Sequence, residues 1–317
     1  MRAVHLSDRL RYVSDHPLPV PLPDEALLRV TLAGICGTDL GILRGYKSFQ
    51  GILGHELVGV VTASPDPSWL HRRVVAEINC GCGRCPWCRN GRPAHCPQRT
   101  VPGILGRDGF FADYCAMPVR NLHLLPEEVS DRAAVFVEPL AAALRITEQV
   151  HIRPHESVVL VGDGRLGLLV AQVLALTGCR LQVVGRHPEN WSILHDRGMQ
   201  VCLDTEVAAE GQAETVVECS GSAAGFQLAL RLLRPGGRLV LKSTFHGTLP
   251  IPLADCVVQE FQWIGSRCGP FAPAIRLLQQ QRIEVEPLIT ACYPLPEALA
   301  ALAHAGQRGA LKILLQP

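Results

Sequence analysis

The sequence predicts an α/β protein in which a mostly antiparallel β domain is followed by a doubly wound parallel sheet. The first 140 residues alternate short β-branched runs with Pro and Gly turns, which is typical of antiparallel strands. From about residue 155 the pattern becomes apolar strand, glycine turn and amphipathic helix, and it repeats. At 317 residues the chain exceeds what one hydrophobic core usually supports, so we expect two domains.

Runs of apolar and β-branched residues locate the strands of both domains. In the β domain they cover 26–34, 56–64 and 72–78. In the second domain we expect strands at 157–161, 180–185, 215–220 and 238–243, with helices at 166–177, 188–197, 222–233 and 271–281. A helix at 296–305 and a strand at 311–315 could end the second domain or return to the first.

Composition excludes several classes of partner. Hydrophobic residues make up 48% and charged residues 19%, which argues against a long disordered arm. A net charge of +1 gives no electrostatic reason to expect nucleic acid or an anionic membrane, so the expected ligand is a small molecule. The N-terminus lacks the apolar core of a signal peptide, and no stretch approaches the roughly 18 apolar residues of a membrane span. We therefore expect a cytoplasmic protein whose thirteen cysteines are reduced or bind metal.

Four cysteines share the spacing C-x2-C-x2-C-x7-C: Cys82, Cys85, Cys88 and Cys96. Four thiolates can close a tetrahedron around one zinc and leave no open position, which predicts a structural rather than a catalytic site. An iron–sulfur cluster is an alternative, although the flanking sequence does not follow the common ferredoxin runs. Free thiols are another, and Cys80 lies close enough to compete for the assignment.

A glycine-rich turn follows the strand expected at 157–161. Gly162, Gly164 and Gly167 form G-x-G-x-x-G at the start of a helix, with Arg165 and Leu166 inside the motif. In this pattern the first glycine makes the tight turn, the second lets backbone amides approach a pyrophosphate, and the third packs helix on strand. The helix N-terminus adds a positive pole for the phosphates, so the motif predicts a dinucleotide site.

The end of the next strand indicates which dinucleotide is bound. Asp or Glu is expected there if the ribose hydroxyls of NAD are recognised, but the chain reads Val-Gly185-Arg186-His187. A guanidinium suits a 2′-phosphate, which favours NADP over NAD unless Arg186 is only a solvated surface residue. Ser243 stands at the end of the strand expected at 238–243, on the ligand-facing edge, where a cofactor contact and a solvated loop are both compatible with the pattern.

A second candidate metal site lies in the β domain. Cys36 stands in Gly-Ile-Cys-Gly-Thr-Asp, and His55 and Glu56 stand in Gly-His-Glu. Cysteine and neutral imidazole are good zinc ligands, and a third ligand plus water would complete an open, catalytic tetrahedron. Each fragment alone is equally compatible with a structural role.

Taken in order, these motifs resemble the zinc-containing medium-chain alcohol dehydrogenase family, which includes threonine and sorbitol dehydrogenases. The resemblance extends over nearly the whole chain and includes the Glu138-Pro139 pair. It implies that Cys36 and His55 bind a catalytic zinc with Glu56 as an exchangeable ligand, and that Glu138 is the third ligand or binds the zinc water. It also implies that the Thr38 hydroxyl accepts the substrate proton and that Asp39 orients the ligand histidine.

The resemblance further implies a GroES-like barrel at 1–140 and 285–317 and a Rossmann domain at 141–284. It implies two zinc ions per chain, one catalytic and one structural, and hydride transfer between NAD(P) and a small alcohol, a polyol or its carbonyl product. A homo-oligomer, dimer or tetramer, is expected on the same basis. Gly41 stands where many relatives carry the histidine that relays protons to solvent.

Two other functions remain compatible with the pattern. One is a zinc-free enone or quinone reductase of the same superfamily, which needs no metal. The other is a non-enzymatic NADP-binding sensor that keeps only the structural zinc, and the missing relay histidine supports it.

Overall fold

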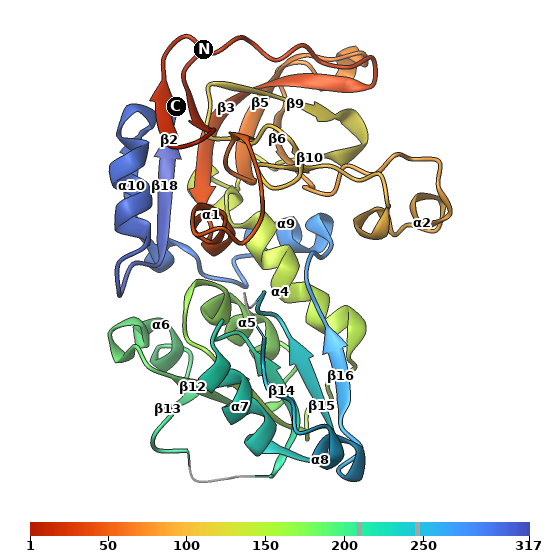
Figure 1. The fold of residues 1–317 in the computed structure, drawn as a ribbon, viewed down its shortest axis with the longest axis vertical. Helices are drawn as coiled ribbons and strands as arrows, with labels where there is room; N and C mark the ends of the chain where they lie inside the picture. The colour runs from red at the N-terminus through yellow and green to blue at the C-terminus, as the bar shows by residue number, and fades with distance from the viewer. Residues whose placement is uncertain (208–210, 245–247) are drawn as a thin grey trace. The chain divides into compact units, whose positions relative to one another are not determined.

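A computed structural model of the chain describes residues 1–207, 211–244 and 248–317 (Figure 1). The chain divides into two compact units. The first combines Met1–Glu138 with Phe271–Pro317, and the second is Pro139–Pro270. The expected second domain runs to residue 284, whereas the second unit ends at Pro270.

The first unit is built on a seven-stranded sheet in the order β10-β6-β5-β3-β18-β17, with β9 also paired to β3. Its central strand, β3, is 11 residues long, and all pairs that β3 makes are antiparallel. Phe110, Phe111 and Met117 are fully buried in the core of this unit. The strands are β3 (Glu25–Ile35), β5 (Glu56–Ala63), β6 (Arg73–Ala76), β9 (Tyr114–Pro118), β10 (Leu122–Leu124), β17 (Ile289–Pro294) and β18 (Lys312–Gln316).

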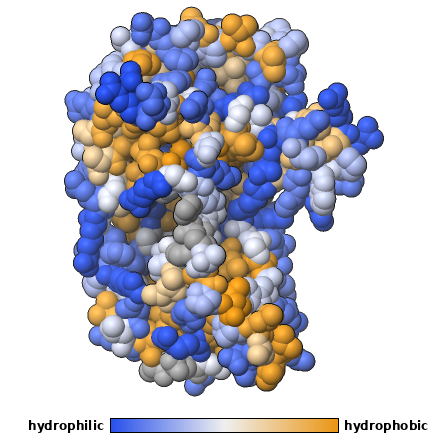
Figure 2. Space-filling view, in the orientation of Figure 1, coloured by the Kyte–Doolittle hydropathy of each residue, from blue (hydrophilic) through white to orange (hydrophobic). Residues whose placement is uncertain are grey.

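Smaller elements complete the first unit. A three-stranded sheet has the order β2-β1-β4, and two short strands, β7 and β8, pair in parallel. The segment from Cys82 to Cys96, here called the cysteine lobe, contains α2. Its surface on the face drawn in Figure 2 is mostly hydrophilic. The bounds are β1 (Ala3–Leu6), β2 (Leu10–Val13), β4 (Gly51–Ile52), β7 (Val101–Pro102), β8 (Gly106–Arg107), α1 (Gly37–Leu43), α2 (Pro86–Arg89) and α3 (Asp131–Ala134).

The C-terminal tail returns to the first unit, which decides between the two destinations that the sequence allowed. β18 pairs antiparallel with β3, with Leu314 opposite Gly34, and α10 (Ala298–Ala305) packs on β18. The helix expected at 271–281 is present as α9 (Phe271–Gln279). It belongs to the first unit because it contacts α3 and because the Phe271 ring lies 5.5 Å from that of His123.

The second unit contains a six-stranded parallel sheet in the order β13-β12-β11-β14-β15-β16. Strand order reverses between β11 and β14, and in such sheets ligands bind beyond the carboxyl ends of the strands at the reversal. Four of these strands overlap the expected ones, whereas β13 and β16 were not anticipated. The strands are β11 (Ser157–Val161), β12 (Arg180–Gly185), β13 (Gln200–Leu203), β14 (Ala213–Glu218), β15 (Leu233–Leu241) and β16 (Gln262–Gly265).

The helices of the second unit are α5 (Arg165–Ala175), α6 (Ser192–His195), α7 (Ala223–Leu232), α8 (Leu253–Val258) and most of α4 (Val137–Gln149). The helix expected at 188–197 is only partly present: a 3-10 turn at Pro188–Asn190 precedes α6, which is one turn long. Trp191, between them, keeps a helical backbone conformation, and its indole donates to Asp163. Within the described residues, no helix has the length and apolar content needed to cross a membrane.

Candidate functional site

Two neighbouring strands of the first unit bring the candidate catalytic ligands together. β3 ends one residue before Cys36, and antiparallel β5 begins at Glu56, directly after His55. The strand register places Gly34 opposite Glu56, so both motifs meet at one end of the pair. One ligand atom from each of Cys36, His55 and Glu56 lies within 4.8 Å of the others. Sulfur, imidazole nitrogen and carboxylate oxygen are all zinc donors, so the donor set fits zinc.

Asp39 fixes the orientation of the histidine. Its carboxylate Oδ1 lies 3.1 Å from Nδ1 of His55, and its Oδ2 accepts a 2.8 Å hydrogen bond from the Cys36 amide. Because an ionised carboxylate only accepts, Nδ1 is the donor and Nε2 is left for a metal. Burial acts to lower the pKa of His55, but Asp39 and Cys36 outweigh it and raise that pKa well above 6.5. The site therefore favours positive charge, which a divalent cation would supply.

Thr38 lies in the first turn of α1, beside the cysteine. Its Oγ1 is 3.8 Å from Cys36 Sγ, and the residue is half-buried. Gly41 follows on the same helix, and a Cβ there would touch only the Tyr46 side chain, at 3.5 Å. A hydroxyl therefore stands next to the candidate metal position, where a proton acceptor for a bound alcohol would be needed.

Lys312 is a member of this site that the sequence did not reveal. Its Nζ donates to Glu56 at 2.7 Å (Oε1) and 2.5 Å (Oε2), and it lies 3.5 Å from the Ile35 carbonyl oxygen. Both side chains of the ion pair are buried, at 4% and 0% exposure. The only available signal was a lone lysine before an apolar strand, and the pairing of β18 with β3 that positions it is not readable from local sequence. The charge of Glu56 is thus balanced by a cation from the chain itself.

Glu138 is placed differently from the other expected ligands. It lies in the first turn of α4, is half-buried and is the last residue of the first unit. In the described part of the chain, the group formed by Cys36, His55 and Glu56 does not include it. Its assignment as third ligand or as the group that binds the zinc water therefore stays a prediction.

The four cysteines of the lobe form a second group. The Sγ atoms of Cys82, Cys85, Cys88 and Cys96 all lie within 4.8 Å of one another. The Cys82 amide points at Cys96 Sγ from 3.4 Å, and the Cys88 amide at Cys85 Sγ from 3.5 Å. Backbone hydrogen bonds from Arg84 and Cys85 lower the pKa of the Cys82 thiol to about 6. Converging sulfurs that accept backbone hydrogen bonds fit a closed, four-thiolate zinc site.

Cys80 stands apart from this group. Its backbone exchanges hydrogen bonds with Thr100 at 3.0 and 3.1 Å, and its side chain is buried. Burial raises the pKa of the Cys80 thiol to about 11, and within the described residues Cys80 is not part of the group of converging sulfurs. Cys80 is therefore a core residue beside the lobe.

The glycine motif of the second unit adopts the geometry that its spacing predicts. Gly162 has φ of +118°, and a Cβ there would lie 2.7 Å from the Cys219 carbonyl carbon. A Cβ at Gly167 would lie 2.1 Å from the Gly162 oxygen, whereas nothing lies within 4 Å of that position at Gly164. The turn is therefore closed on the sheet side and open at Gly164, directly before α5, where a phosphate could approach.

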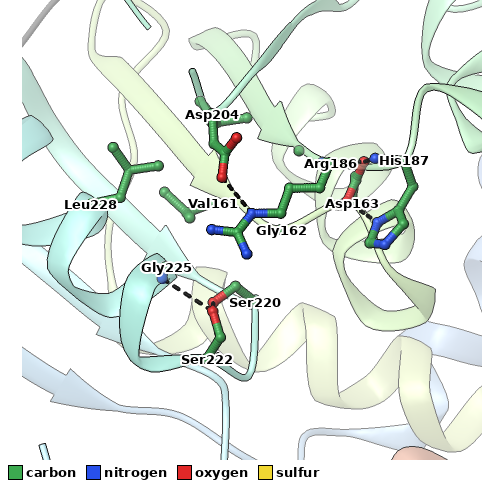
Figure 3. A pocket seen from close by; sticks show the side chains of 12 residues that line it. Val161, Gly162, Asp163, Arg186, His187, Asp204, Ser220, Ser222, Gly225 and Leu228 are labelled. Atoms are coloured by element: carbon green, nitrogen blue, oxygen red, sulfur yellow. Dashed lines mark hydrogen bonds and ion pairs between the residues drawn. The ribbon is translucent and has the colours of Figure 1, made fainter. Parts of the chain in front are cut away.

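A pocket of about 200 Å³ lies beyond the carboxyl ends of β11, β12 and β14 (Figure 3). Of the residues expected to bind cofactor, Gly162, Gly185 and Arg186 line it. Gly164, Arg165, Leu166 and Gly167 belong to the adjoining turn and helix start. The remaining lining residues in the described chain are Val161, Asp163, Val184, His187, Asp204, Ser220, Ser222, Gly225 and Leu228.

Ser243 lies outside this lining. Its Oγ accepts a 2.8 Å hydrogen bond from the Gly221 amide, so it ties the end of β15 to the loop after β14. Its part in cofactor binding stays a prediction. Asp163, Asp204 and Ser220 were missed by the sequence reasoning, because the middle residue of the turn and the residues after β13 and β14 carry no specific motif.

Two family models match long segments of the chain. Residues 22–127 match the family model of the alcohol dehydrogenase GroES-like domain. Residues 166–280 match that of the zinc-binding dehydrogenases. The two matches cover the strands that carry the candidate catalytic ligands, the cysteine lobe and most of the parallel sheet.

Similar proteins extend along almost the full chain. L-galactonate-5-dehydrogenase from Escherichia coli is 28% identical, over 92% of this chain and 89% of its own length. Sorbitol dehydrogenase from Halalkalibacterium halodurans is 28% identical, over 96% of this chain and 95% of its own. Among solved structures, alcohol dehydrogenase TADH from Thermus sp. ATN1 has a TM-score of 0.91 at 28% identity and full coverage of both chains.

A structure described as a zinc-binding dehydrogenase from Sinorhizobium meliloti 1021 bound to NADP has a TM-score of 0.89. It is 28% identical and covers 100% of this chain and 99% of its own. The expected combination of a GroES-like domain and a Rossmann domain is confirmed by these matches. The chain belongs to the zinc-containing medium-chain alcohol dehydrogenase family.

Proposed function

We propose that this protein is a zinc-dependent dehydrogenase that transfers a hydride between a polyol-type alcohol and NADP. The observation that carries the proposal is the group formed by half-buried Cys36 with buried His55 and Glu56, in which Asp39 orients the imidazole of His55. The polyol class comes from relatives whose names state sorbitol, arabitol and galactonate as substrates. The three candidate zinc donors and the match to the zinc-binding dehydrogenases favour this proposal over a zinc-free reductase and over a sensor that keeps only the structural zinc.

Each residue of the first site has a proposed role. Cys36 and His55 would hold the metal, Glu56 would be an exchangeable ligand, and Glu138 would be the third ligand or bind the metal's water. When bound, zinc supplies a Lewis acid that lowers the pKa of an alcohol, and the nicotinamide ring supplies a hydride acceptor. The Thr38 hydroxyl would receive the proton of the alcohol. Asp39 keeps Nδ1 of His55 protonated, so that Nε2 would be free to bind the metal.

Lys312 would decide how Glu56 behaves. A carboxylate that accepts from an ammonium on both oxygens is a weaker metal ligand than a free one, because the cation competes with the metal for the same lone pairs. Glu56 would therefore bind the metal only transiently, when substrate or water leaves. This supports Cys36 and His55 as the permanent ligands.

The cofactor proposal rests on the pocket in the second unit. It contains a guanidinium, Arg186, at the end of β12, where an NAD-specific site carries an acid. Arginine recognises phosphate through parallel N–H donors, which supports NADP over NAD. Gly162, Gly164 and Gly167 would shape the pyrophosphate turn, with Arg165, Leu166 and Ser243 beside it.

Two further features complete the proposal. The lobe of Cys82, Cys85, Cys88 and Cys96 would hold a second, structural zinc, and its reduced thiols suit a cytoplasmic location. The protein would form a homo-oligomer, dimer or tetramer. In support, α8 exposes Leu253, Val257 and Val258 at 69%, 68% and 77%, and Figure 2 shows hydrophobic surface where α8 lies.

The experiment that tests the proposed function is a substrate screen on purified protein. Sorbitol, D-arabitol, xylitol and L-galactonate are offered with NADP⁺ or NAD⁺, and reduced nicotinamide is followed by absorbance. We expect turnover in wild type and in Cys292→Ser, which alters an exposed thiol outside both groups. Cys36→Ser should abolish turnover and leave NADPH binding unchanged. Turnover retained in Cys36→Ser would contradict the proposed metal site.

A further inference from the structure

The cofactor pocket contains an ion pair inside its own lining. Arg186 follows β12 and Asp204 follows β13, and these parallel strands are in register, with Gly185 opposite Leu203. The Asp204 amide donates to the Gly185 carbonyl at 3.1 Å, which holds the two residues side by side. Nε of Arg186 is hydrogen-bonded to Oδ2 of Asp204. Figure 3 shows the guanidinium reaching into the pocket toward that carboxylate.

Folding stability does not explain this pair. The Arg186 side chain is 53% exposed, and exposed ion pairs contribute little because water and salt screen them. Asp204 is only 21% exposed and faces the pocket that lies above the glycine turn. An anionic group is therefore built into the part of the site where the arginine would meet a cofactor phosphate.

The backbone that carries Arg186 is held in place by Asp163. Oδ2 of that carboxylate accepts hydrogen bonds from the amides of Arg186 (3.0 Å) and His187 (2.7 Å) and from Nε1 of Trp191 (2.7 Å). Oδ1 is 2.8 Å from Nδ1 of His187. Gly185 makes room for it, because a Cβ there would lie 2.1 Å from Asp163 Oδ2. With the loop fixed, only the Arg186 side chain is left to exchange one partner for another.

We propose that Asp204 is a specificity-determining residue for the cofactor, because its carboxylate occupies the Arg186 guanidinium and competes with the 2′-phosphate of NADP(H). The inference rests on the proposed function, since it assumes that the pocket binds the adenosine end of NAD(P). NADP differs from NAD there by a phosphate group that carries between one and two negative charges. That phosphate must either displace Asp204 from Nε of Arg186 or bind the remaining guanidinium N–H groups close to the Asp204 carboxylate, and either course costs binding free energy. NADH has no 2′-phosphate and does not meet this cost. Asp204 therefore reduces the preference for NADPH over NADH that Arg186 alone would create.

The test compares dissociation constants of NADPH and NADH, measured by fluorescence titration without any substrate. Asp204→Asn keeps the shape of the side chain and removes its charge. We expect the ratio of the NADH to the NADPH dissociation constant to rise roughly tenfold, through tighter NADPH binding. Arg186→Gln should lower the ratio. In the double variant Arg186→Gln/Asp204→Asn, the ratio of dissociation constants should equal that of Arg186→Gln alone, because Asp204 acts through the guanidinium.

A matched control removes the same charge from the same loop. Glu206 is exposed, lies two residues after Asp204 and is outside the pocket lining of the described chain. Glu206→Gln should leave the ratio within about twofold of wild type, because exposed charges are screened beyond a Debye length of about 8 Å.

Three results would overturn the inference. The first is Asp204→Asn weakening NADH with no gain for NADPH, which would make Asp204 an acceptor for ribose hydroxyls. The second is an equal gain for NADPH in the Arg186→Gln background. The third is a ratio that Glu206→Gln changes as much as Asp204→Asn does. Failure of the proposed function has a different signature, because wild-type protein would then bind neither nucleotide or would turn over no alcohol.

Discussion

Lys312 Nζ lies 2.5 Å from Glu56 Oε2, and both side chains are almost completely buried. The contact joins the first residue of the last strand to the first residue of β5, which are 256 positions apart. Nζ of Lys312 also lies 5.6 Å from the centre of the Phe136 ring, so the ammonium is enclosed by protein. The C-terminal strand β18 thus supplies a charge to the candidate metal site as well as pairing with β3.

Removing that charge should destabilise the protein strongly. Lys312→Met leaves the Glu56 carboxylate buried without its partner, and such losses cost about 3–5 kcal/mol of unfolding free energy. Lys312→Arg keeps the charge and should lose less. Urea denaturation measures these differences, with Lys47→Met at an exposed lysine as the control, expected within about 0.5 kcal/mol of wild type.

The double variant Lys312→Met/Glu56→Gln separates the ion pair from simple packing. Because it removes both charges, it should recover a large part of the stability lost in Lys312→Met. A double variant as unstable as the single one would show that the methylene packing of Lys312, rather than its charge, matters.

Asp39→Asn should weaken zinc binding without removing a ligand. Asparagine cannot provide two carboxylate oxygens to Nδ1 of His55 and the Cys36 amide, so the imidazole loses its fixed orientation. Loss of such an outer carboxylate typically lowers metal affinity roughly 10–100-fold. Competition with a coloured chelator measures this, and Asp8→Asn, at an exposed carboxylate, serves as the control. Unchanged zinc retention in Asp39→Asn would contradict the orienting role.

Cys88→Ser should remove one zinc per chain and loosen the lobe. With three thiolates left, the closed tetrahedron is incomplete, and amide hydrogens across residues 80–100 should exchange faster. Elemental analysis also tests the iron–sulfur alternative, since it distinguishes iron from zinc. Cys292→Ser, outside both groups of ligands, should keep the full metal content. Metal content that is equal in the two variants would refute a metal site in the lobe.

The lowered pKa of Asp163 predicts that the second unit loses stability in acid. Burial acts to raise the pKa of Asp163, but hydrogen bonds from His187, Trp191 and two backbone amides outweigh it and hold the pKa below its ordinary value of 3.8. Because the folded-state pKa is the lower one, this contribution to stability is present above about pH 4 and is lost as the pH falls through the folded-state value. Asp163→Asn should therefore flatten the fall in stability below about pH 4. An unchanged slope would mean that other carboxylates cause it.

Local patterns were sufficient to predict several of the strands and most residues of the two candidate metal-ligand groups. β11 and β12 span the expected residues because apolar runs bounded by Gly and polar residues leave few other structures. Cys36, His55 and the four lobe cysteines converge because their motifs flank paired strands or lie within one short loop. The spacing of these residues along the chain is therefore enough to predict that they converge.

Contacts between segments that are distant along the chain could not be predicted from local sequence patterns. Lys312 reaches Glu56 only because β18 pairs with β3, and Asp204 reaches Arg186 only because β13 is the neighbour of β12. Lys242, near the end of the strand expected at 238–243, is buried and donates to the carbonyls of Ala142 and Arg267, which local sequence does not indicate. The hydrogen bond from Trp191 to Asp163, which joins the loop after β12 to the glycine turn, could not be predicted from local sequence either.

The most direct test of the central claim is turnover of a polyol with NADP⁺ before zinc removal, after it and after zinc is restored. Elemental analysis of each sample and NADPH titration accompany the rates. We predict two zinc ions per chain at the start, loss of turnover with cofactor binding retained in the stripped protein, and recovery on adding zinc. Undiminished turnover by zinc-free protein would contradict the account and favour a metal-independent reductase.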